Sequence, residues 1–371
     1  MKVCLDIQAA MAQRAGVGRY TRALVEHLDT DRGADTLRLF YFDFLHRGDP
    51  LAAPGMDRKR IRWCPGRLAQ HCWKTIQWPP FNWLAGPADL YHFPNFIIPP
   101  LSAGKAVVTI HDVSFLRYPA FAESRNLAFL TARISRTVQR AEAIITDSQF
   151  SAREIAQLLK VDPARIAAIP LGISDRLAHP GPERIAAWRS AHGLERPYLL
   201  TVGTLEPRKN HDFLIRVFER LDKFDGLLVI AGLRGWKYEP ILERIRNSGR
   251  ARDIRYLDYV ADDDLPSLYG GAELFLFPSL YEGFGFPPLE AMACGLPVLS
   301  SAAGSLEEVL GNGARLMREF DADAWAVEAQ RLLTDSAARQ AWIDKGRQQA
   351  ALYRWPETAR KTWELYRKVA G

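Results

Sequence analysis

Short apolar runs alternate with helical periodicity along the whole chain, and this alternation limits the possible fold more than any other feature. Each run is short enough for a buried strand, and turn or helix patterns separate the runs. Strands that alternate with helices build parallel sheets with crossover helices. The predicted strands are Val3–Ile7, Leu37–Phe42, Ala106–Ile110, Ala143–Thr146, Ile166–Ile169, Tyr198–Val202, Leu227–Ala231 and Leu274–Phe277. The sequence therefore predicts an α/β fold.

The chain of 371 residues has the length of two ordinary domains. The alternation weakens between residues 170 and 197, where prolines and glycines surround one short helix, and we interpret this stretch as a linker. Two doubly wound domains are predicted, 1–172 and 173–356, with ligands outside the carboxyl ends of their strands. Residues 357–371 begin like a helix, and they either stay with the second domain or pack back on the first.

The composition is that of a globular enzyme, with 48% hydrophobic and 25% charged residues. The four cysteines form no C-x-x-C pair, which indicates free thiols in a reducing compartment and no structural zinc. The first residues carry Asp6 and no long apolar core, which indicates a strand rather than a signal peptide. No apolar run approaches the roughly 20 residues that span a bilayer. We expect a cytoplasmic protein.

The net charge of +6 is compatible with an anionic small-molecule donor, an anionic membrane surface or nucleic acid. Residues 58–88 hold basic residues and tryptophans but no acidic residue. The predicted helix 125–141 has an apolar stripe on one side, with further arginines around it: Arg125, Arg133, Arg136 and Arg140. Such arginines are usually a solvated face, but together the two stretches also predict peripheral docking to anionic lipid. No recognition motif for nucleic acid accompanies them.

Two glutamates, Glu282 and Glu290, flank a segment rich in glycine and proline. We expect a strand at 275–277, a loop up to Gly285 and a helix that begins at Pro287, which puts Glu290 in the first helical turn. Both carboxylates would then face one cleft. The helix N-terminus and the loop amides can bind a pyrophosphate, while carboxylates accept hydrogen bonds from sugar and ribose hydroxyls. Either glutamate alone could instead complement the helix dipole or be solvated.

The segment Glu282–Val298 resembles the donor-site signature of retaining glycosyltransferases of family 4. These enzymes have the GT-B fold, in which two Rossmann-like domains face each other across a cleft. The resemblance implies that Glu290 holds the ribose hydroxyls and that Glu282 contacts the donor sugar. It also places loop amides beside that sugar, at Gly283, Phe284 and Gly285. It implies a nucleotide-sugar substrate, GDP- or UDP-linked, with no cofactor and no metal.

A second stretch that matches the family, 202–210, follows a strand and opens a helix. Family members place a lysine here against the donor diphosphate, and Lys209 takes this role by position. The sequence departs from the pattern at Thr204, where many members carry an arginine, and we expect Arg208 to replace that arginine. Gly203 and Thr204 are predicted to lie in the same donor site.

The stretch 256–265 resembles the strand and loop that bind the donor base, and it implies recognition by the backbone near Tyr259 and Val260. Asp262 to Asp264 also contain a D-x-D triplet, which binds metal in the other large glycosyltransferase fold. Because an apolar helix follows, we interpret the triplet as a helix cap.

In the first half, Gly16 and Gly18 form a glycine loop that opens a predicted helix 19–28. Glycine lets a backbone approach a phosphate or sugar closely, although a turn without ligand remains the alternative. The spacing differs from the dinucleotide fingerprint. Asp43, at the end of the second predicted strand, still leaves a dehydrogenase open.

The predicted strand 107–110 delivers His111 and Asp112 at its carboxyl end. The resemblance implies that His111 contacts the donor sugar, while a structural histidine is the alternative and Asp112 would orient the ring on the acceptor side. Asn95 follows a segment, 91–94, that resembles the acceptor-side loop of the family. Ser148 or Ser151 is predicted to cap the next helix.

The resemblance covers nearly the whole chain and implies a retaining hexosyltransferase that moves a sugar, mannose by preference, to a glycan or lipid-linked oligosaccharide. Cell-surface polysaccharide or lipopolysaccharide synthesis is the expected process, at the inner face of the cytoplasmic membrane. Lys209 and Arg208 would neutralise the leaving diphosphate, while Glu282 and His111 position the sugar. A nucleotide-sugar epimerase, a phosphorylase and a non-catalytic scaffold share the expected two-domain shape and remain alternatives.

Overall fold

The computed structural model describes residues 1–13, 16–30, 33–46, 48, 51, 56–121, 124–177 and 180–371, and the side chains of 124–126 lie outside this description. The chain forms two compact units. The first contains Met1–Val113, Arg125–Gly172 and Arg354–Gly371, and the second contains Ser114–Ser124 and Ile173–Tyr353. The chain therefore passes from one unit to the other four times, after residues 113, 124, 172 and 353.

The first unit is built on a parallel sheet with the order β3-β2-β1-β4-β5-β6-β7. Its strands are β1 (Lys2–Asp6), β2 (Thr36–Phe42), β3 (Asp57–Ile61), β4 (Leu90–Phe93), β5 (Lys105–Thr109), β6 (Ala143–Thr146) and β7 (Ile166–Ala168). The strand order reverses between β1 and β4, which pair directly. In doubly wound sheets, ligands bind outside the carboxyl ends of the strands at such a point.

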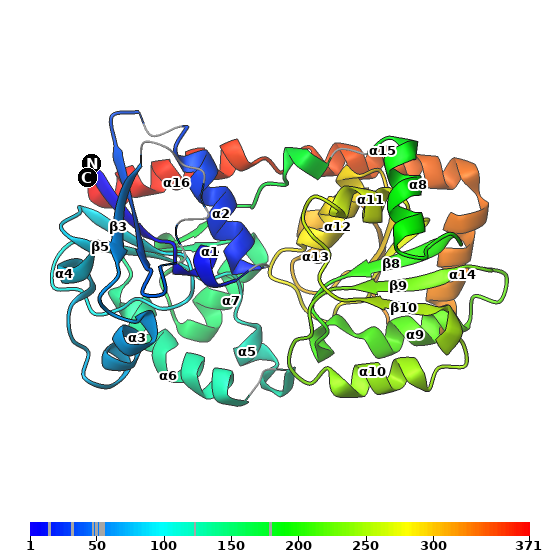
Figure 1. Cartoon of the computed structure of the whole chain (residues 1–371), viewed down its shortest axis with the longest axis horizontal. Helices are drawn as coiled ribbons and strands as arrows, with labels where there is room; N and C mark the ends of the chain where they lie inside the picture. Colours follow the sequence, from blue (N-terminus) through cyan, green and yellow to red (C-terminus); the bar gives the residue numbers. More distant parts are fainter. Residues whose placement is uncertain are drawn as a thin grey trace. The chain divides into compact units, whose positions relative to one another are not determined.

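Helices of the first unit alternate with these strands, as the sequence predicts. They are α1 (Gln8–Ala12), α2 (Val17–Leu28), α3 (Gly66–Thr75), α4 (Phe81–Ala85), α6 (Ser124–Arg140), α7 (Gln149–Leu159) and α16 (Trp355–Ala370). Helix α2 begins at Val17, two residues before the predicted start, because Gly16 already occupies the N-cap position. In Figure 1, α2 and α16 lie together at the top of this unit, and α3 and α6 lie at its lower edge.

The last helix, α16, completes the first unit, which resolves the alternative left open by the sequence. Its Trp363 side chain is buried and donates a hydrogen bond from Nε1 to the carbonyl of Leu28, at 3.0 Å. The hydroxyl of Thr358 donates to the carbonyl of Pro170, at 2.7 Å. Figure 1 shows the red helix α16 beside the blue helix α2.

The second unit contains a parallel sheet with the order β10-β9-β8-β11-β12-β13. Its strands are β8 (Tyr198–Val202), β9 (Leu227–Ala231), β10 (Ile254–Leu257), β11 (Leu274–Phe277), β12 (Val298–Ser301) and β13 (Arg315–Met317). Its helices are α5 (Ser114–Arg117), α8 (Pro182–Ala191), α9 (His211–Glu219), α10 (Glu239–Arg246), α11 (Leu265–Gly270), α12 (Phe286–Ala293), α13 (Leu306–Leu310), α14 (Ala322–Thr334) and α15 (Ser336–Ala350). Both units therefore have the predicted α/β architecture.

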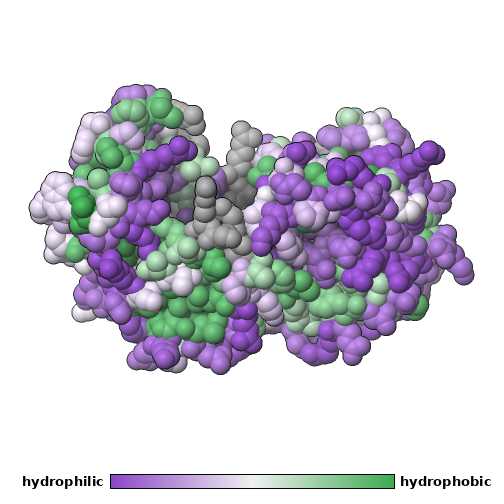
Figure 2. Space-filling view, turned by 90° about the horizontal axis from the view of Figure 1, so that it is seen from below, coloured by the Kyte–Doolittle hydropathy of each residue, from purple (hydrophilic) through white to green (hydrophobic). Residues whose placement is uncertain are grey.

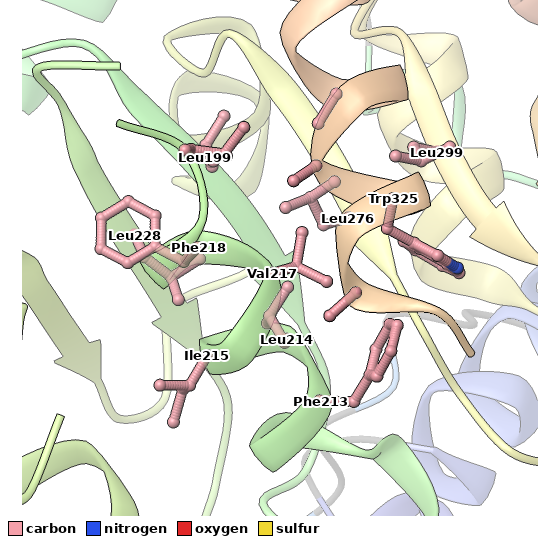
Figure 3. Close-up of a cluster of buried hydrophobic side chains, with 14 of the residues drawn as sticks. Leu199, Phe213, Leu214, Ile215, Val217, Phe218, Leu228, Leu276, Leu299 and Trp325 are labelled. Atoms are coloured by element: carbon pink, nitrogen blue, oxygen red, sulfur yellow. The ribbon is translucent and has the colours of Figure 1, made fainter. Parts of the chain in front are cut away.

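Helices α9 and α14 pack on each other and cover one region of this second sheet, as Figure 3 shows. Phe213, Leu214, Val217 and Phe218 of α9 are spaced by three or four residues and form one buried face, against which α14 places Trp325. Burial of each such side chain contributes about 1.5–3 kcal/mol. This core fixes β8 and β11, from whose carboxyl ends the loops of the candidate site emerge.

The segment Ser114–Ser124 belongs to the second unit, although it lies inside the predicted domain 1–172. The Tyr118 ring packs edge-on against the Tyr281 ring, with centroids 5.7 Å apart, and Lys237 donates to the carbonyl of Ala120, at 2.7 Å. Contacts far along the chain therefore override sequence proximity here. None of the helices in the described ranges is both long and apolar enough to cross a membrane.

Candidate functional site

Three of the predicted site residues meet where β8 and β11 end. These strands are parallel neighbours, so the loops that follow them emerge at the same edge of the sheet. Lys209 Nζ lies 2.6 Å from Glu282 Oε1, and Arg208 Nη1 lies 2.9 Å from Glu282 Oε2. The structure thus joins the adjacent residues Arg208 and Lys209 to Glu282, which lies 73 residues after Lys209, in one charged cluster.

Two further residues complete this cluster, and the sequence assigned them no role. The hydroxyl of Ser279 donates to Glu282 Oε1, at 2.5 Å. Glu206 accepts hydrogen bonds from Nε and Nη2 of Arg208, at 3.0 and 2.6 Å, while Arg208 Nη1 also donates to the carbonyl of Tyr281. Glu206 and Glu282 are both buried. The two cations are therefore matched by two buried carboxylates.

The carboxyl group of Glu282 is strongly acidic in this surrounding. Burial alone would raise its pKa, but the charges of Arg208 and Lys209 and the hydrogen bonds from Lys209 and Ser279 outweigh burial and lower the pKa to about 2. Glu282 is therefore an anion at neutral pH. It can accept hydrogen bonds from a ligand, but it carries no proton to donate as a general acid.

Gly304 and Ser305 hold the backbone of Glu282. Gly304 has a φ of +65°, and a Cβ atom there would lie 2.5 Å from the carbonyl oxygen of Glu282. The amide of Ser305 donates to that carbonyl at 3.0 Å, and its hydroxyl bonds the carbonyls of Glu282 and Phe284. This support comes from the stretch after β12, which was not predicted as a strand.

Glu290 lies one residue further into α12 than predicted. The helix begins at Phe286, because Gly285 adopts a φ of +115° at the N-cap, and Glu290 is consequently the fifth helical residue. The prediction of a first-turn position is therefore wrong. The carboxylate is buried, and the hydroxyl of Tyr269 on α11 donates to its Oε2, at 3.0 Å.

Two loop residues near Glu282 and Lys209, Phe284 and Gly203, have structural roles. The Phe284 side chain is buried against Phe286 and Tyr353, each with a centroid distance of 5.5 Å, so this side chain has a packing role. A Cβ at Gly203 would lie 3.4 Å from Lys209 Cε, so glycine leaves room for the lysine chain. Their contacts with a donor, and those of Gly283, Gly285 and Thr204, stay predictions.

The predicted base-binding residues Tyr259 and Val260 follow β10. The Tyr259 amide donates to Oδ1 of Asp258, at 2.9 Å, and its side chain is partly exposed. Asp264 occupies the N-cap position of α11, as the interpretation of the triplet predicts, but its side chain makes no capping hydrogen bond. Within the described ranges, no three His, Cys, Asp or Glu side chains are grouped as a metal ion would require.

In the first unit, His111 follows β5 and lies against a buried aspartate. Its Nδ1 is 2.8 Å from Oδ2 of Asp147. Burial lowers the pKa of His111, but the charge and the hydrogen bond of Asp147 outweigh burial and raise it. Asp147 therefore orients the ring, and the charge of Asp112 also raises the pKa of His111. The Tyr20 ring also packs edge-on against the imidazole, with centroids 4.8 Å apart.

A chain of buried hydrogen bonds supports the strand behind His111. His92 Nε2 lies 2.8 Å from Thr109 Oγ1, and His92 Nδ1 lies 2.6 Å from the hydroxyl of Tyr366 on α16. Burial lowers the pKa of His92 to about 3, so this ring is neutral. His92 belongs to β4, and the predicted acceptor-side loop therefore begins only at Pro94.

The remaining predicted residues of the first unit have distinct surroundings. Gly16 has a φ of +57°. A Cβ at Gly18 would lie 2.0 Å from the carbonyl oxygen of Gln13, so close packing alone requires this glycine. Ser148 caps α7 by accepting from the Ser151 amide, which confirms the predicted cap. Asn95 is exposed and lines a cavity described below.

Comparisons with known proteins agree on one family. The model of Glycosyltransferase Family 4 matches residues 14–177, and that of Glycosyl transferases group 1 matches residues 184–349. The O-antigen chain mannosyltransferase B of Escherichia coli is 30% identical over 382 aligned residues, which cover 99% of this chain and 100% of the relative. The protein is thus a glycosyltransferase. Within that class, the chain belongs to family 4, as the donor-site resemblance predicts.

Solved structures establish the fold. A sucrose-phosphate synthase from Thermosynechococcus elongatus has a TM-score of 0.76 at 20% identity and covers 100% of this chain and 99% of its own. The Anabaena protein HepE, in complex with UDP and glucose, has a TM-score of 0.71 at 18% identity and covers 99% of both chains. The predicted GT-B fold, with two Rossmann-like units, is confirmed.

Proposed function

We propose that this glycosyltransferase uses a nucleoside diphosphate sugar as its donor and transfers the sugar with retention at the anomeric carbon, without a metal ion. The observation that carries the proposal is the cluster of Lys209, Arg208 and Glu282 where β8 and β11 end. A diphosphate needs fixed cations, and a sugar needs acceptors for its hydroxyls, and this cluster supplies both.

In the proposed mechanism, the donor diphosphate replaces one oxygen of Glu282 at the ammonium group of Lys209. The freed oxygen then accepts a hydrogen bond from a hydroxyl of the donor sugar. Lys209 stabilises the charge that builds on the departing diphosphate, while Glu206 and the Tyr281 carbonyl keep Arg208 in place. The acceptor hydroxyl attacks the anomeric carbon on the face that the diphosphate leaves. The bond between that carbon and the diphosphate breaks, and the hydroxyl proton passes to an oxygen of the departing diphosphate.

The other predicted residues take roles around this exchange. Glu290 accepts hydrogen bonds from the ribose hydroxyls, and the backbone near Tyr259 binds the base. His111 contacts the donor sugar with its Nε2 side, in place of the Pro94 carbonyl that lies 3.3 Å from Nε2, while its Nδ1 is held by Asp147. A hydrogen bond that fixes one nitrogen of an imidazole ring also sets the direction in which the other nitrogen points.

We propose mannose from GDP-mannose as the donor sugar and a glycan or lipid-linked oligosaccharide as the acceptor, in cell-surface polysaccharide or lipopolysaccharide synthesis. The full-length similarity to a protein named O-antigen chain mannosyltransferase B supports mannose and this process. A UDP-linked sugar is the alternative, supported by the UDP in the HepE structure. Thermal-shift measurements with GDP-, UDP- and ADP-sugars distinguish these donors.

The deciding experiment incubates the protein with the preferred donor and a mannan oligosaccharide in EDTA, and reads the anomeric configuration of the product by NMR. We expect a product with the configuration of the donor. Lys209→Ala and Glu282→Ala should each lose most activity, whereas Lys223→Ala, which removes an exposed lysine from the same unit, should not. An inverted product or a metal requirement contradicts the mechanism. Donor conversion without acceptor indicates an epimerase, and binding without reaction indicates a scaffold.

We also propose a cytoplasmic location with peripheral contact to an anionic membrane. The stretch 58–88 exposes more than half of the side chains of Trp63, Ile76, Trp78 and Trp83 beside its basic residues. Figure 2, which views the molecule from below, shows a hydrophobic area bordered by hydrophilic residues on the first unit. Sedimentation with phosphatidylglycerol vesicles should occur at low salt and weaken at high salt. Absence of binding at low salt contradicts this contact.

A further inference from the structure

A cavity of about 500 Å³ lies in the first unit, apart from the charged cluster of the second unit. Its wall includes Asp6 where β1 ends and Phe93, Pro94 and Asn95 where β4 ends. Because the strand order reverses between β1 and β4, the cavity occupies the ligand position of a doubly wound sheet. Helices α3 and α6 contribute further lining residues to the wall of the cavity.

Five cationic side chains line this cavity. Helix α3 contributes Arg67 and Lys74, and α6 contributes Arg133, Arg136 and Arg140, which recur at intervals of three and four residues and so share one helix face. In the described ranges, no carboxylate forms an ion pair with any of the five. Burial and the charges of Arg136 and Arg140 lower the pKa of Arg133, as mutual repulsion of clustered cations requires.

The lining offers little negative charge to offset these cations. Asp6 is the one acidic residue among the described lining residues. Its carboxylate accepts a hydrogen bond from the Gln8 amide, at 2.9 Å, and burial raises its pKa to about 6. At neutral pH, five positive charges therefore face one negative charge, and a ligand with two or more negative charges would relieve the imbalance.

Three of the cationic side chains, those of Lys74, Arg133 and Arg140, are held in place by the protein. Arg133 donates to the carbonyl of Lys74, at 2.8 Å, and Arg140 donates to Gln77 Oε1, at 3.0 Å. The Phe129 ring lies under Lys74 Nζ and Arg133, at 4.4 and 5.2 Å from its centroid. Donors that are already fixed in position lose little freedom when an anion binds, so the cavity is prepared for one.

Apolar and cationic surfaces share the same cavity. Phe93 and Trp73 are buried lining residues, and Trp73 Nε1 is fixed by a hydrogen bond to the Pro79 carbonyl, at 2.7 Å. Guanidinium groups bind phosphate oxygens in pairs, whereas aromatic rings pack on sugar rings or hydrocarbon. The lining therefore suits a phosphate ester with an organic substituent better than a small carboxylate.

We propose that this cavity binds the phosphate or diphosphate group of the acceptor, held by the arginines of α6 and by Arg67 and Lys74 of α3. The inference rests on the proposed function, because it assigns the acceptor to the first unit. Two sources carry this chemistry: a soluble sugar phosphate and a lipid-linked diphosphate. Arg136 is the clearest probe, since its side chain is exposed and its substitution removes one positive charge from the lining of the cavity.

The test measures pyrophosphate binding by calorimetry in the full chain carrying Lys209→Ala, which removes the competing diphosphate site of the second unit. We expect binding that weakens at high salt and falls about tenfold or more with Arg136→Glu, as loss of a charged hydrogen bond predicts. The matched control is Arg153→Glu on α7, an exposed arginine of the same unit outside the cavity. Equal weakening by both variants, or no binding to the Lys209→Ala protein, overturns the proposal.

Two further probes separate the sources. Competition with mannose 1-phosphate and with farnesyl diphosphate compares a soluble sugar phosphate with a lipid diphosphate, and tighter binding of either supports the proposal for that source. Thermal shifts with nucleotide sugars in the Arg136→Glu protein test the proposed donor function separately from the proposed acceptor site. A normal donor shift with lost pyrophosphate binding supports the acceptor site, whereas lost donor shifts in the wild-type protein would refute the proposed donor function alone.

Discussion

Removal of the Glu282 carboxylate should destabilise the second unit much more than removal of the Lys209 ammonium group. In Glu282→Ala, the ammonium group of Lys209, whose side chain is only 11% exposed, loses its ion pair with Glu282. In Lys209→Ala, Glu282 keeps both the Arg208 guanidinium and the Ser279 hydroxyl. An uncompensated buried charge costs about 3–5 kcal/mol, whereas one lost hydrogen bond costs about 1 kcal/mol.

These values translate into separate melting temperatures. With about 3 kcal/mol for Glu282→Ala, the lower end of that range because Lys209 is not fully buried, the transition of this unit should fall by roughly 6–12 °C. Lys209→Ala should lower it by only roughly 2–4 °C. Differential scanning calorimetry of the full chain measures both, and hydrogen exchange of segments 203–210 and 279–285 assigns the loss to this site.

The double variant Lys209→Ala/Glu282→Ala tests whether the two side chains form a charge pair. When both Lys209 and Glu282 become alanine, no orphaned lysine charge remains, so the protein should be more stable than the sum of the single effects by about 1–2 kcal/mol. Effects that add within about 0.5 kcal/mol, or equal losses in the two single variants, would refute the assigned charge pairing. Activity cannot replace this measurement, because both single variants are expected to lose most of it.

Three other predictions concern His111, Gly304 and Glu282. Asp147→Asn should lower the pKa of His111, since it removes the charge that raises that pKa, and NMR titration of the ring proton measures the change; an unchanged value contradicts the assignment. Gly304→Ala should abolish most activity and lower the melting temperature, because its Cβ would collide with the Glu282 carbonyl; wild-type activity would contradict this. Because the folded pKa of Glu282 is depressed to about 2, its contribution to stability is complete above pH 4.5 and is lost as the pH falls through about 2, and acid unfolding of Glu282→Gln should lack this component.

Strands with continuous apolar runs were readable from the sequence, and β1, β8, β9 and β11 lie where the runs predict them. The edge strand β3 was not, because its residues Asp57–Ile61 are mostly charged and exposed and carry no apolar run. Its place in the sheet comes from pairing with β2, a contact that composition does not encode. Several buried strands can therefore be predicted from apolar runs, but the short buried strands β4 and β12 were missed together with the edge strand β3.

The candidate site shows the same division. Lys209 and Glu282 could be selected because each follows a strand in a segment that resembles the family pattern. Asp147, 36 residues from His111, and Gly304, whose backbone packs on Glu282, could not be assigned their roles. Such supporting residues act through contacts that depend on strand order and loop path, and short motifs contain neither.

The placement of α16 has a consequence for synthesis of the protein. All of the second unit, through Tyr353, is made before α16, whereas the first unit, begun at Met1, lacks its last helix until then. The growing chain must therefore carry the first unit unfinished, with His92 lacking the Tyr366 hydroxyl and Leu28 lacking the Trp363 indole, while the second unit folds behind it. Within this chain, synthesis of the first unit therefore starts before and ends after synthesis of the second unit.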